Sequence, residues 1–351
     1  MIKLLEAVLP YIKGLWTLPW ILIGFVVTVL LSKVIGEEKV NKSMKKIGLV
    51  LLYVFVPLLL FRIFLGVDFR QNEIFFTIVC FIILSLMYVL AYFFAKSKAN
   101  KFNIKGTDRR HFIKTILTNQ GRSSAFVGGA MLAIQEWGVL AAIYMCIGAI
   151  FLFVFIPYIL SFLHKKDIDD KSLKIHTLPW YLKLFPWYLL TFAISAVLIH
   201  GITGITSRNF GDMGVIFEFF TSLTIPAALY YVGAGINPHD LKINELKKLI
   251  WGKLDYNSSD PWLSVRNIFY LTVIVTPLLT ILFFVIFLFF KFIPKEWFVV
   301  IVINSILPIT STNMFLVPYG INKKITALSV TWTTIFCVPI VILLITIFEI
   351  Y

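Results

Sequence analysis

Two short polar runs interrupt long apolar stretches of this chain. The first is Asn119-Gln120-Gly121-Arg122-Ser123-Ser124, and the second is Pro308-Ile309-Thr310-Ser311-Thr312-Asn313, with Asn304 one turn before it. Lipid offers no partner to free backbone N–H and C=O groups, so a broken helix at membrane depth survives only where protein or a water-filled cavity surrounds it. Paired breaks in corresponding spans of two halves point to the binding site of a transporter.

Arg122 is the residue whose chemistry is most specific. By helical rise it lies about 15 Å from the inner end of its span, near the bilayer midplane. An arginine at that depth costs about 2.5–3.5 kcal/mol on insertion scales, so its side chain should face protein or water. Its planar fork suits a carboxylate. Two interpretations stay open: Arg122 binds or gates an anionic ligand, or it caps carbonyls of the broken helix.

The neighbours of Arg122 are amides and hydroxyls, which either satisfy freed backbone groups and adjacent helices or bind a substrate. Pro308 removes an N–H and kinks its span. Helix N-terminal ends attract anions and C-terminal ends attract cations, and with Arg122 added we expect the centre to favour an anion. The predicted substrate-binding set is Arg122, Asn119, Gln120, Ser123, Ser124, Pro308, Thr310, Ser311, Thr312, Asn313 and Asn304.

The composition places the chain in a membrane. Of 351 residues, 59% are hydrophobic and only 14% are charged, and the mean hydropathy is +0.90. A soluble domain is nearer half apolar and a quarter charged. A span needs roughly 20 apolar residues. We predict ten spans, at 14–32, 47–67, 74–95, 112–134, 137–163, 184–205, 213–236, 267–290, 297–319 and 325–348.

Five spans precede a polar loop and five follow it. The chain is therefore predicted to consist of an N-terminal five-helix repeat (1–163), a cytoplasmic linker (164–183) and a C-terminal five-helix repeat (184–351). An odd number of spans per half makes the halves enter the membrane in opposite directions, which is an inverted repeat. The fourth span of each half is the broken one, so the expected fold is an all-α membrane protein whose helices 4 and 9 cross.

Lysine and arginine counts indicate the orientation. With the N-terminus outside, the inner loops carry 24 of the 32 basic residues, the outer segments carry six, and Arg62 and Arg122 lie within spans. Cytoplasmic loops carry the excess of Lys and Arg, so both termini are predicted outside. Arg62, near the outer end of its span, is expected to snorkel towards water. Glu218 is expected to be an interfacial acid paired with Arg62 or Arg208.

Several function classes lack sequence support. The net charge of +14 is accounted for by the inner loops, and no nucleic-acid recognition module occurs. Cys80, Cys146 and Cys337 lie in apolar spans and are expected to be small buried hydrophobes. The spans show no nucleophile with a base, no metal-ligand cluster and no paired midplane acids. We therefore expect no enzyme, no metal site, no cofactor and no nucleic-acid partner.

At these residues the chain resembles the auxin efflux carrier family, which includes bacterial malate and malonate permeases and plant PIN carriers. The segment from Gly121 to Leu132 is similar to the family's fourth span, and the segment from Pro226 to Gly235 is similar to its seventh. Leu307 to Asn313, Pro318-Tyr319-Gly320 and Thr331-Trp332-Thr333-Thr334 are similar to its ninth and tenth spans. The chain departs from the pattern at Ser124, where the family often has Asn, and at Ala130, where it often has Pro.

The resemblance implies a ten-helix inverted repeat with a scaffold of spans one, two, six and seven and a mobile core of the others. It also implies elevator-type alternating access for a small mono- or dicarboxylate, coupling to H⁺ or Na⁺ or to neither ion, a homodimer, and residence in the cell membrane. The alternative is a ligand-sensing membrane receptor of the same fold that performs no net transport.

Overall fold

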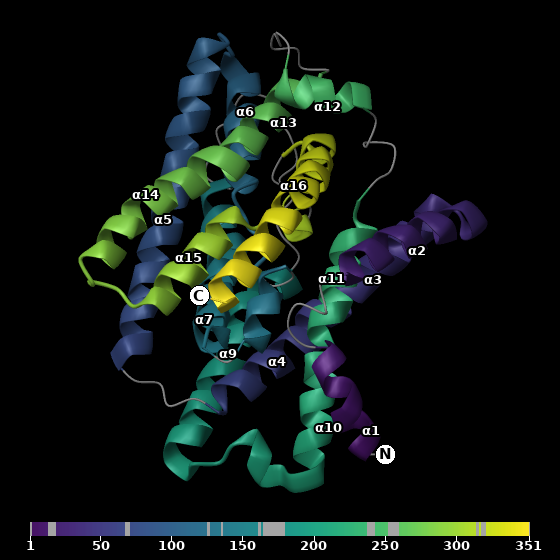
Figure 1. Cartoon of the computed structure of the whole chain (residues 1–351). Coiled ribbons are helices and arrows are strands. Elements are labelled where there is room, and N and C mark those ends of the chain that lie inside the picture. The colour runs from purple at the N-terminus through teal and green to yellow at the C-terminus, as the bar shows by residue number, and fades with distance from the viewer. Residues whose placement is uncertain are drawn as a thin grey trace. The chain divides into compact units, whose positions relative to one another are not determined.

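The computed structural model describes residues 2–12, 19–66, 71–124, 127–134, 136–160, 163, 180–236, 243–251, 260–313, 316 and 321–350. Within these residues all regular secondary structure is helical. The predicted linker up to residue 179, the start of the first predicted span and Pro318-Tyr319-Gly320 lie outside the described residues. In the N-terminal part (Figure 1) the helices are α1 (Ile2–Val8), α2 (Trp20–Ile35), α3 (Glu37–Val50), α4 (Val56–Phe64), α5 (Gln71–Lys101), α6 (Gly106–Thr118) and α7 (Gly138–Ile150).

The later part of the chain continues the all-helical pattern. Its helices are α9 (Trp180–Thr203), α10 (Gly211–Ser222), α11 (Thr224–Ala234), α12 (Ile243–Ile250), α13 (Trp262–Phe269), α14 (Thr276–Phe289), α15 (Lys295–Ile306) and α16 (Lys323–Ile350). Short 3₁₀ segments are η1 (Leu9–Ile12), η4 (Gly128–Ala133) and η6 (Ser207–Phe210). Wider π-helical turns are η3 (Leu51–Phe55), η5 (Phe151–Phe155) and η8 (Tyr270–Val275).

Six helices among the described residues are long and apolar enough to cross a membrane, so the chain is a multi-pass membrane protein. They are Glu37–Phe64, Gln71–Lys101, Gly138–Leu160, Gly211–Ala234, Trp262–Phe289 and Lys323–Glu349. Two shorter apolar helices, Trp20–Ile35 and Trp187–Thr203, fall in the first and sixth predicted spans. The remaining two predicted spans, 112–134 and 297–319, contain no uninterrupted helix of that length, because α6 ends at Thr118 and α15 ends at Ile306.

Each π-helical turn ends two residues before a proline. The prolines are Pro57 after η3, Pro157 after η5 and Pro277 after η8. Proline has no N–H to donate and its ring clashes with the carbonyl one turn earlier. A widened turn removes that clash without ending the helix. These spans therefore stay continuous across their prolines.

The described helices group into two compact units. Unit 1 comprises Met1–Ile78, Ser124–Cys146 and Phe185–Ile236, and unit 2 comprises Val79–Ser123, Ile147–Leu184 and Asn237–Tyr351. Each unit takes segments from both halves of the chain. This grouping by contact is a different property from the predicted repeat, which concerns the order of spans along the sequence.

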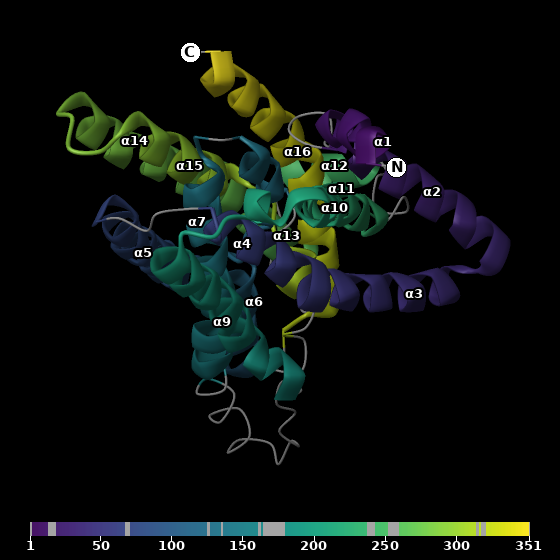
Figure 2. The same cartoon turned by 90° about the horizontal axis from the view of Figure 1, so that it is seen from below.

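In unit 1, helices α2 and α11 cross at glycines. A Cβ on Gly24 would lie 2.1 Å from the Tyr230 carbonyl oxygen, and a Cβ on Gly233 would lie 1.8 Å from the Ile21 carbonyl oxygen. Only glycine permits backbones to approach this closely, which is the usual device of membrane helix pairs. Helices α2 and α3 meet at Gly36, whose φ of +91° suits glycine, and they diverge from it in Figure 2.

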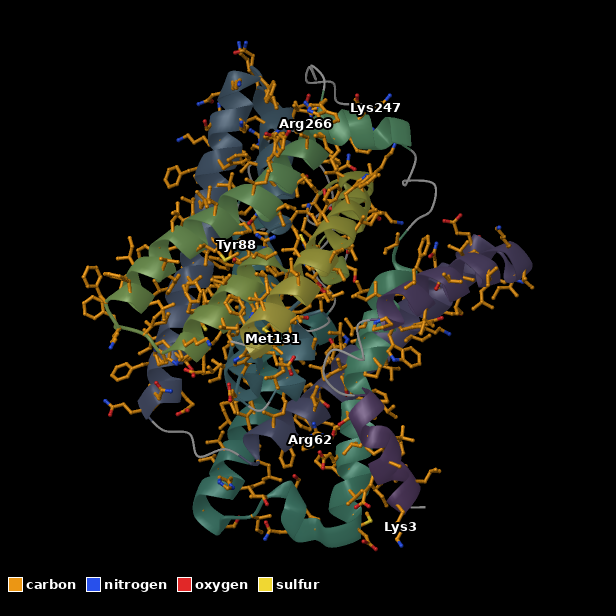
Figure 3. The ribbon with its side chains drawn as sticks, in the orientation of Figure 1. Lys3, Arg62, Tyr88, Met131, Lys247 and Arg266 are labelled. Carbon is orange, nitrogen blue, oxygen red and sulfur yellow. The ribbon has the colours of Figure 1, made fainter. Side chains whose placement is uncertain are left out.

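Arg62 links helices α4 and α10 of unit 1 through hydrogen bonds. From α4 its Nη1 donates to the Glu218 carbonyl oxygen at 2.7 Å and to the Ser222 hydroxyl at 2.9 Å, both in α10. Arg62 therefore has acceptors in α10 (Figure 3), and its snorkelling towards water stays a prediction. The predicted pairing with Glu218 is present as an electrostatic interaction and as this contact with the Glu218 backbone.

Unit 2 surrounds α15, whose residues from Trp297 to Ile306 are all buried. Helix α16 packs on α13 and α15, and α14 packs on α15. At one end, α12 lies across α13 (Figure 1), where Arg266 donates to the carbonyl oxygens of Lys248 and Trp251. Cations at a helix C-terminus stabilise its free carbonyls, so Arg266 fixes α12 onto α13.

Candidate functional site

The two polar runs meet as a short antiparallel pairing inside unit 2. The Ser123 N–H donates to the Pro308 carbonyl at 2.8 Å, and the Thr310 N–H donates to the Gly121 carbonyl at 2.9 Å. Arg122 and Ile309 face each other between these bonds. Backbone groups that α6 and α15 lose at their ends are thus satisfied by each other. These bonds place the two runs next to each other, and the crossing of spans 4 and 9 at the membrane midplane stays a prediction.

Arg122 is 7% exposed. Its Nη1 lies 3.4 Å from the carbonyl oxygen of Leu307, the residue that follows α15. This is the carbonyl-capping interaction of the second interpretation, although the distance is at the long end for a hydrogen bond. Tyr88 of α5 and Cys337 of α16 are within electrostatic range of the guanidinium. Arg122 is therefore held among three elements of unit 2.

The end of α6 presents amide groups to the pairing. Asn119 Nδ2 donates to the Thr115 carbonyl at 2.8 Å and to the Thr326 hydroxyl at 3.3 Å. Asn119 Oδ1, both polar atoms of the Gln120 amide and Ser123 Oγ are buried and have no hydrogen-bond partner among the described residues. Asn119 thus has a structural donor and a spare acceptor, while the Gln120 amide is wholly available to a ligand or to water.

The second run folds back into a single 3₁₀ turn. The Thr310 and Thr312 hydroxyls lie 2.8 Å apart and hydrogen-bond each other, and the Asn313 N–H donates to the Thr310 carbonyl. Ser311 Oγ and both polar atoms of the Asn313 amide are buried without a partner in the described part of the chain. Ser311 and Asn313 are therefore the residues of this run with free hydrogen-bonding capacity, whereas Thr310 and Thr312 stabilise the turn.

Gly121 brings the two runs into direct contact. A Cβ on Gly121 would lie 2.6 Å from Asn313 Oδ1 and 3.2 Å from Leu152 Cδ1. A side chain at this position would displace the Asn313 amide, so glycine allows that amide to lie against the first run. The Asn313 side chain therefore lies against the stretch Gln120-Gly121-Arg122.

Two predicted site residues are placed differently from the rest. Asn304 is buried within α15, and its Nδ2 donates to the Val300 carbonyl of its own helix at 2.8 Å. Ser124 is partly exposed in a turn after the pairing. Neither residue makes a described hydrogen bond to the two paired runs. Pro308 contributes its carbonyl oxygen, not its ring, to the pairing.

Helix α16 contributes residues that the sequence reasoning missed. The Thr333 hydroxyl accepts a hydrogen bond from the Ile309 N–H at 3.1 Å, and Thr326 accepts from Asn119. Ser329, 1% exposed, lies between them along the helix. The signal was a spacing of three and seven residues, which places the three hydroxyls on one helix face. Serines and threonines are common in membrane helices, so this spacing indicates a site only once α16 is known to contact the paired runs.

These atoms define what the arrangement can do chemically. It offers one buried guanidinium, two amide groups with free donors and acceptors, and several hydroxyls. Each unsatisfied buried polar group costs about 1–3 kcal/mol, so water or a polar ligand is expected among them. In the part of the chain that the structure describes, no group of three or more His, Cys, Asp or Glu side chains could hold a metal ion.

Comparisons with known proteins identify no family for this chain. The chain matches no model of a known protein family, and it matches no curated protein.

Proposed function

We propose that this protein is a secondary membrane transporter of a small organic anion, a mono- or dicarboxylate, and that the ligand binds where the two broken segments pair. The observation that carries the proposal is Arg122, a buried arginine that follows Gln120 and Gly121 in the paired backbone. The Gln120 amide and the Asn313 amide, which lies against Gly121, have no hydrogen-bond partner among the described residues. Buried charge in a membrane span is expensive and is a mark of function.

The two interpretations of Arg122 become two states of one cycle. In the structure the guanidinium caps the Leu307 carbonyl through a long contact of 3.4 Å, which ligand binding would replace in this proposal. A carboxylate offers two charged acceptors in a geometry that matches the guanidinium, so a bidentate pair is stronger than that contact. The Gln120 and Asn313 amides and the Ser123 and Ser311 hydroxyls are the candidate donors to the remaining carboxylate lone pairs, of which about two are left.

The pairing itself supports a ten-helix, 5+5 inverted repeat with crossing spans 4 and 9. The bridging residue Arg122 lies four residues after the end of α6, and Ile309 lies three residues after the end of α15. Two segments that leave their helices at nearly the same register and pair antiparallel have the local symmetry of an inverted repeat.

The grouping of helices supports elevator-type alternating access. Unit 1 contains the helices of predicted spans one, two, six and seven, together with the first turns of α5 and the segment Ser124–Cys146. Unit 2 contains the paired runs and the remaining helices. Apart from the start of α5 and Ser124–Cys146, the grouping follows the division into scaffold and mobile core that the resemblance to auxin efflux carriers implies. In this proposal unit 2 carries the anion across the cell membrane, both termini are outside, the protein forms a homodimer, and H⁺ or Na⁺ is the candidate coupling ion.

The test is ligand-dependent thermal stability of the purified protein, followed by flux. A panel of mono- and dicarboxylates is screened with and without Na⁺ and at several pH values, since a ligand of the folded state raises stability by mass action. A selective rise that Arg122→Gln abolishes, together with uptake of that carboxylate into liposomes, supports the proposal. Stabilisation without any uptake favours the ligand-sensing receptor. No stabilisation of well-folded protein by any carboxylate overturns the anion assignment.

A further inference from the structure

One face of helix α16 carries hydroxyl groups that contact both broken segments. Thr326 binds Asn119 at the end of α6, and Thr333, two turns further on, binds the Ile309 N–H. The two contacts place one face of α16 against the first run and then against the second. Whatever lies on this face between Thr326 and Thr333 therefore faces the pairing of the two runs.

Ser329 is the polar residue on that face between the two threonines. At about 100° per residue it lies within roughly 60° of both. Its side chain is 1% exposed, and its hydroxyl has no hydrogen-bond partner among the described residues.

Four of the five other hydroxyls of α16 are satisfied within their own helix. Thr326, Thr333, Thr334 and Thr346 each donate to the carbonyl four residues earlier, at 2.7–3.0 Å. That bond is the ordinary way for a hydroxyl inside a helix to be satisfied. Ser329 does not make it in the described structure, so its hydroxyl is left for something outside its own helix.

We propose that Ser329 is a ligand-contacting residue of the candidate transport site. Its Oγ–H donates a hydrogen bond to the carboxylate from the α16 side, while Arg122 binds the same group from the paired backbone. This rests on the proposed function for the nature of the ligand, but the presence of some polar partner or water at the Ser329 hydroxyl does not. A hydroxyl bond to a charged acceptor predicts a loss of affinity on the order of tenfold when it is removed.

The matched control is Ser305 in α15. It is 0% exposed, but its hydroxyl donates to the Val302 carbonyl at 2.7 Å and is therefore satisfied. Ser329→Ala should weaken binding of the stabilising carboxylate about tenfold with little change in the unliganded melting temperature. Ser305→Ala should leave the affinity within about twofold. Equal affinities for Ser329→Ala and the parent protein would overturn the proposal.

A second measurement does not depend on knowing the ligand. The variants Ser329→Cys and Ser305→Cys are treated with a small water-soluble thiosulfonate, against a background of three buried native cysteines. Modification of Ser329→Cys well above Ser305→Cys supports a solvent-filled site at Ser329, and failure to modify it overturns that site. If Ser329→Cys reacts but no carboxylate protects it, the anion assignment fails and the site stands.

Discussion

At the scale of single residues, Thr333 is the side chain through which α16 holds the second broken segment. Thr333→Val keeps the shape but leaves the buried Ile309 N–H without its acceptor. An orphaned buried donor costs about 1–3 kcal/mol, so we expect a lower melting temperature in detergent and weaker ligand binding. Thr333→Ser retains the hydroxyl and should restore both.

The neighbouring Thr334 provides the control. It is equally buried, and its described hydrogen bond runs to the Val330 carbonyl of its own helix. Thr334→Val should cost clearly less stability than Thr333→Val, because the Val330 carbonyl already accepts from the helical backbone. Equal losses would mean that the Ile309 contact does not stabilise the paired segments.

Gly121 sets how closely the two runs approach. Gly121→Ala places a methyl group 2.6 Å from Asn313 Oδ1, so the amide must rotate away from its position beside the pairing. We expect ligand affinity to fall while the protein remains folded, because the obstructing atom is the end of a movable side chain. Gly129→Ala meets Ile225 only at 3.8 Å, an ordinary contact, and should bind ligand as the parent does. Ligand titration by thermal shift compares the two variants.

The two polar runs of the candidate site could be singled out from sequence, but their hydrogen-bond partners could not. Polar runs stand out against apolar spans, so Arg122, Gln120 and Asn313 could be singled out without coordinates. The hydroxyls that already have hydrogen-bond partners could not be predicted in this way. The Thr310–Thr312 bond and the Thr333–Ile309 bond depend on backbone that has left the helix. Ser329 was missed for the same reason, since its neighbours belong to distant parts of the chain.

At the scale of helices, the crossing of α2 and α11 depends on Gly24 and Gly233. Gly24→Ala would put Cβ 2.1 Å from a backbone oxygen of Tyr230, which cannot move without the whole helix. We expect α2 and α11 to separate and the melting temperature to fall, with overpacking costs of about 1–3 kcal/mol. Gly201→Ala in α9 meets nothing within 4 Å and should be neutral. A Gly24→Ala protein as stable as the parent would contradict this close approach.

The positions of the continuous helices could be predicted from the sequence, but the way they pack could not. Long apolar runs gave the spans that are continuous, and the prolines at 57, 157 and 277 did not end them because a widened turn absorbs each one. The two-unit grouping could not be read from hydropathy, since it depends on which faces meet. Glycines 24 and 233 are far apart in sequence, and a single glycine in a membrane helix carries little information until its partner is known.

At the scale of the whole molecule, the distribution of lysine and arginine makes a prediction about orientation that side-chain chemistry can test. The cysteines Cys80, Cys146 and Cys337 are buried, so the parent protein should react little with a membrane-impermeant maleimide. Lys295→Cys, in the segment predicted outside, should be labelled on intact cells. Lys105→Cys, in a predicted inner loop, should be labelled only after the membrane is opened.

Both positions are exposed in the structure, so a difference between them reports the side of the membrane and not burial. The expectation follows from 24 basic residues in the inner loops against six outside. The reverse pattern would invert the orientation without changing the pairing of the broken segments. Labelling of both on intact cells would place residues 105 and 295 on the same side, and the ten-span inverted repeat would then be abandoned, because it puts an odd number of spans between them.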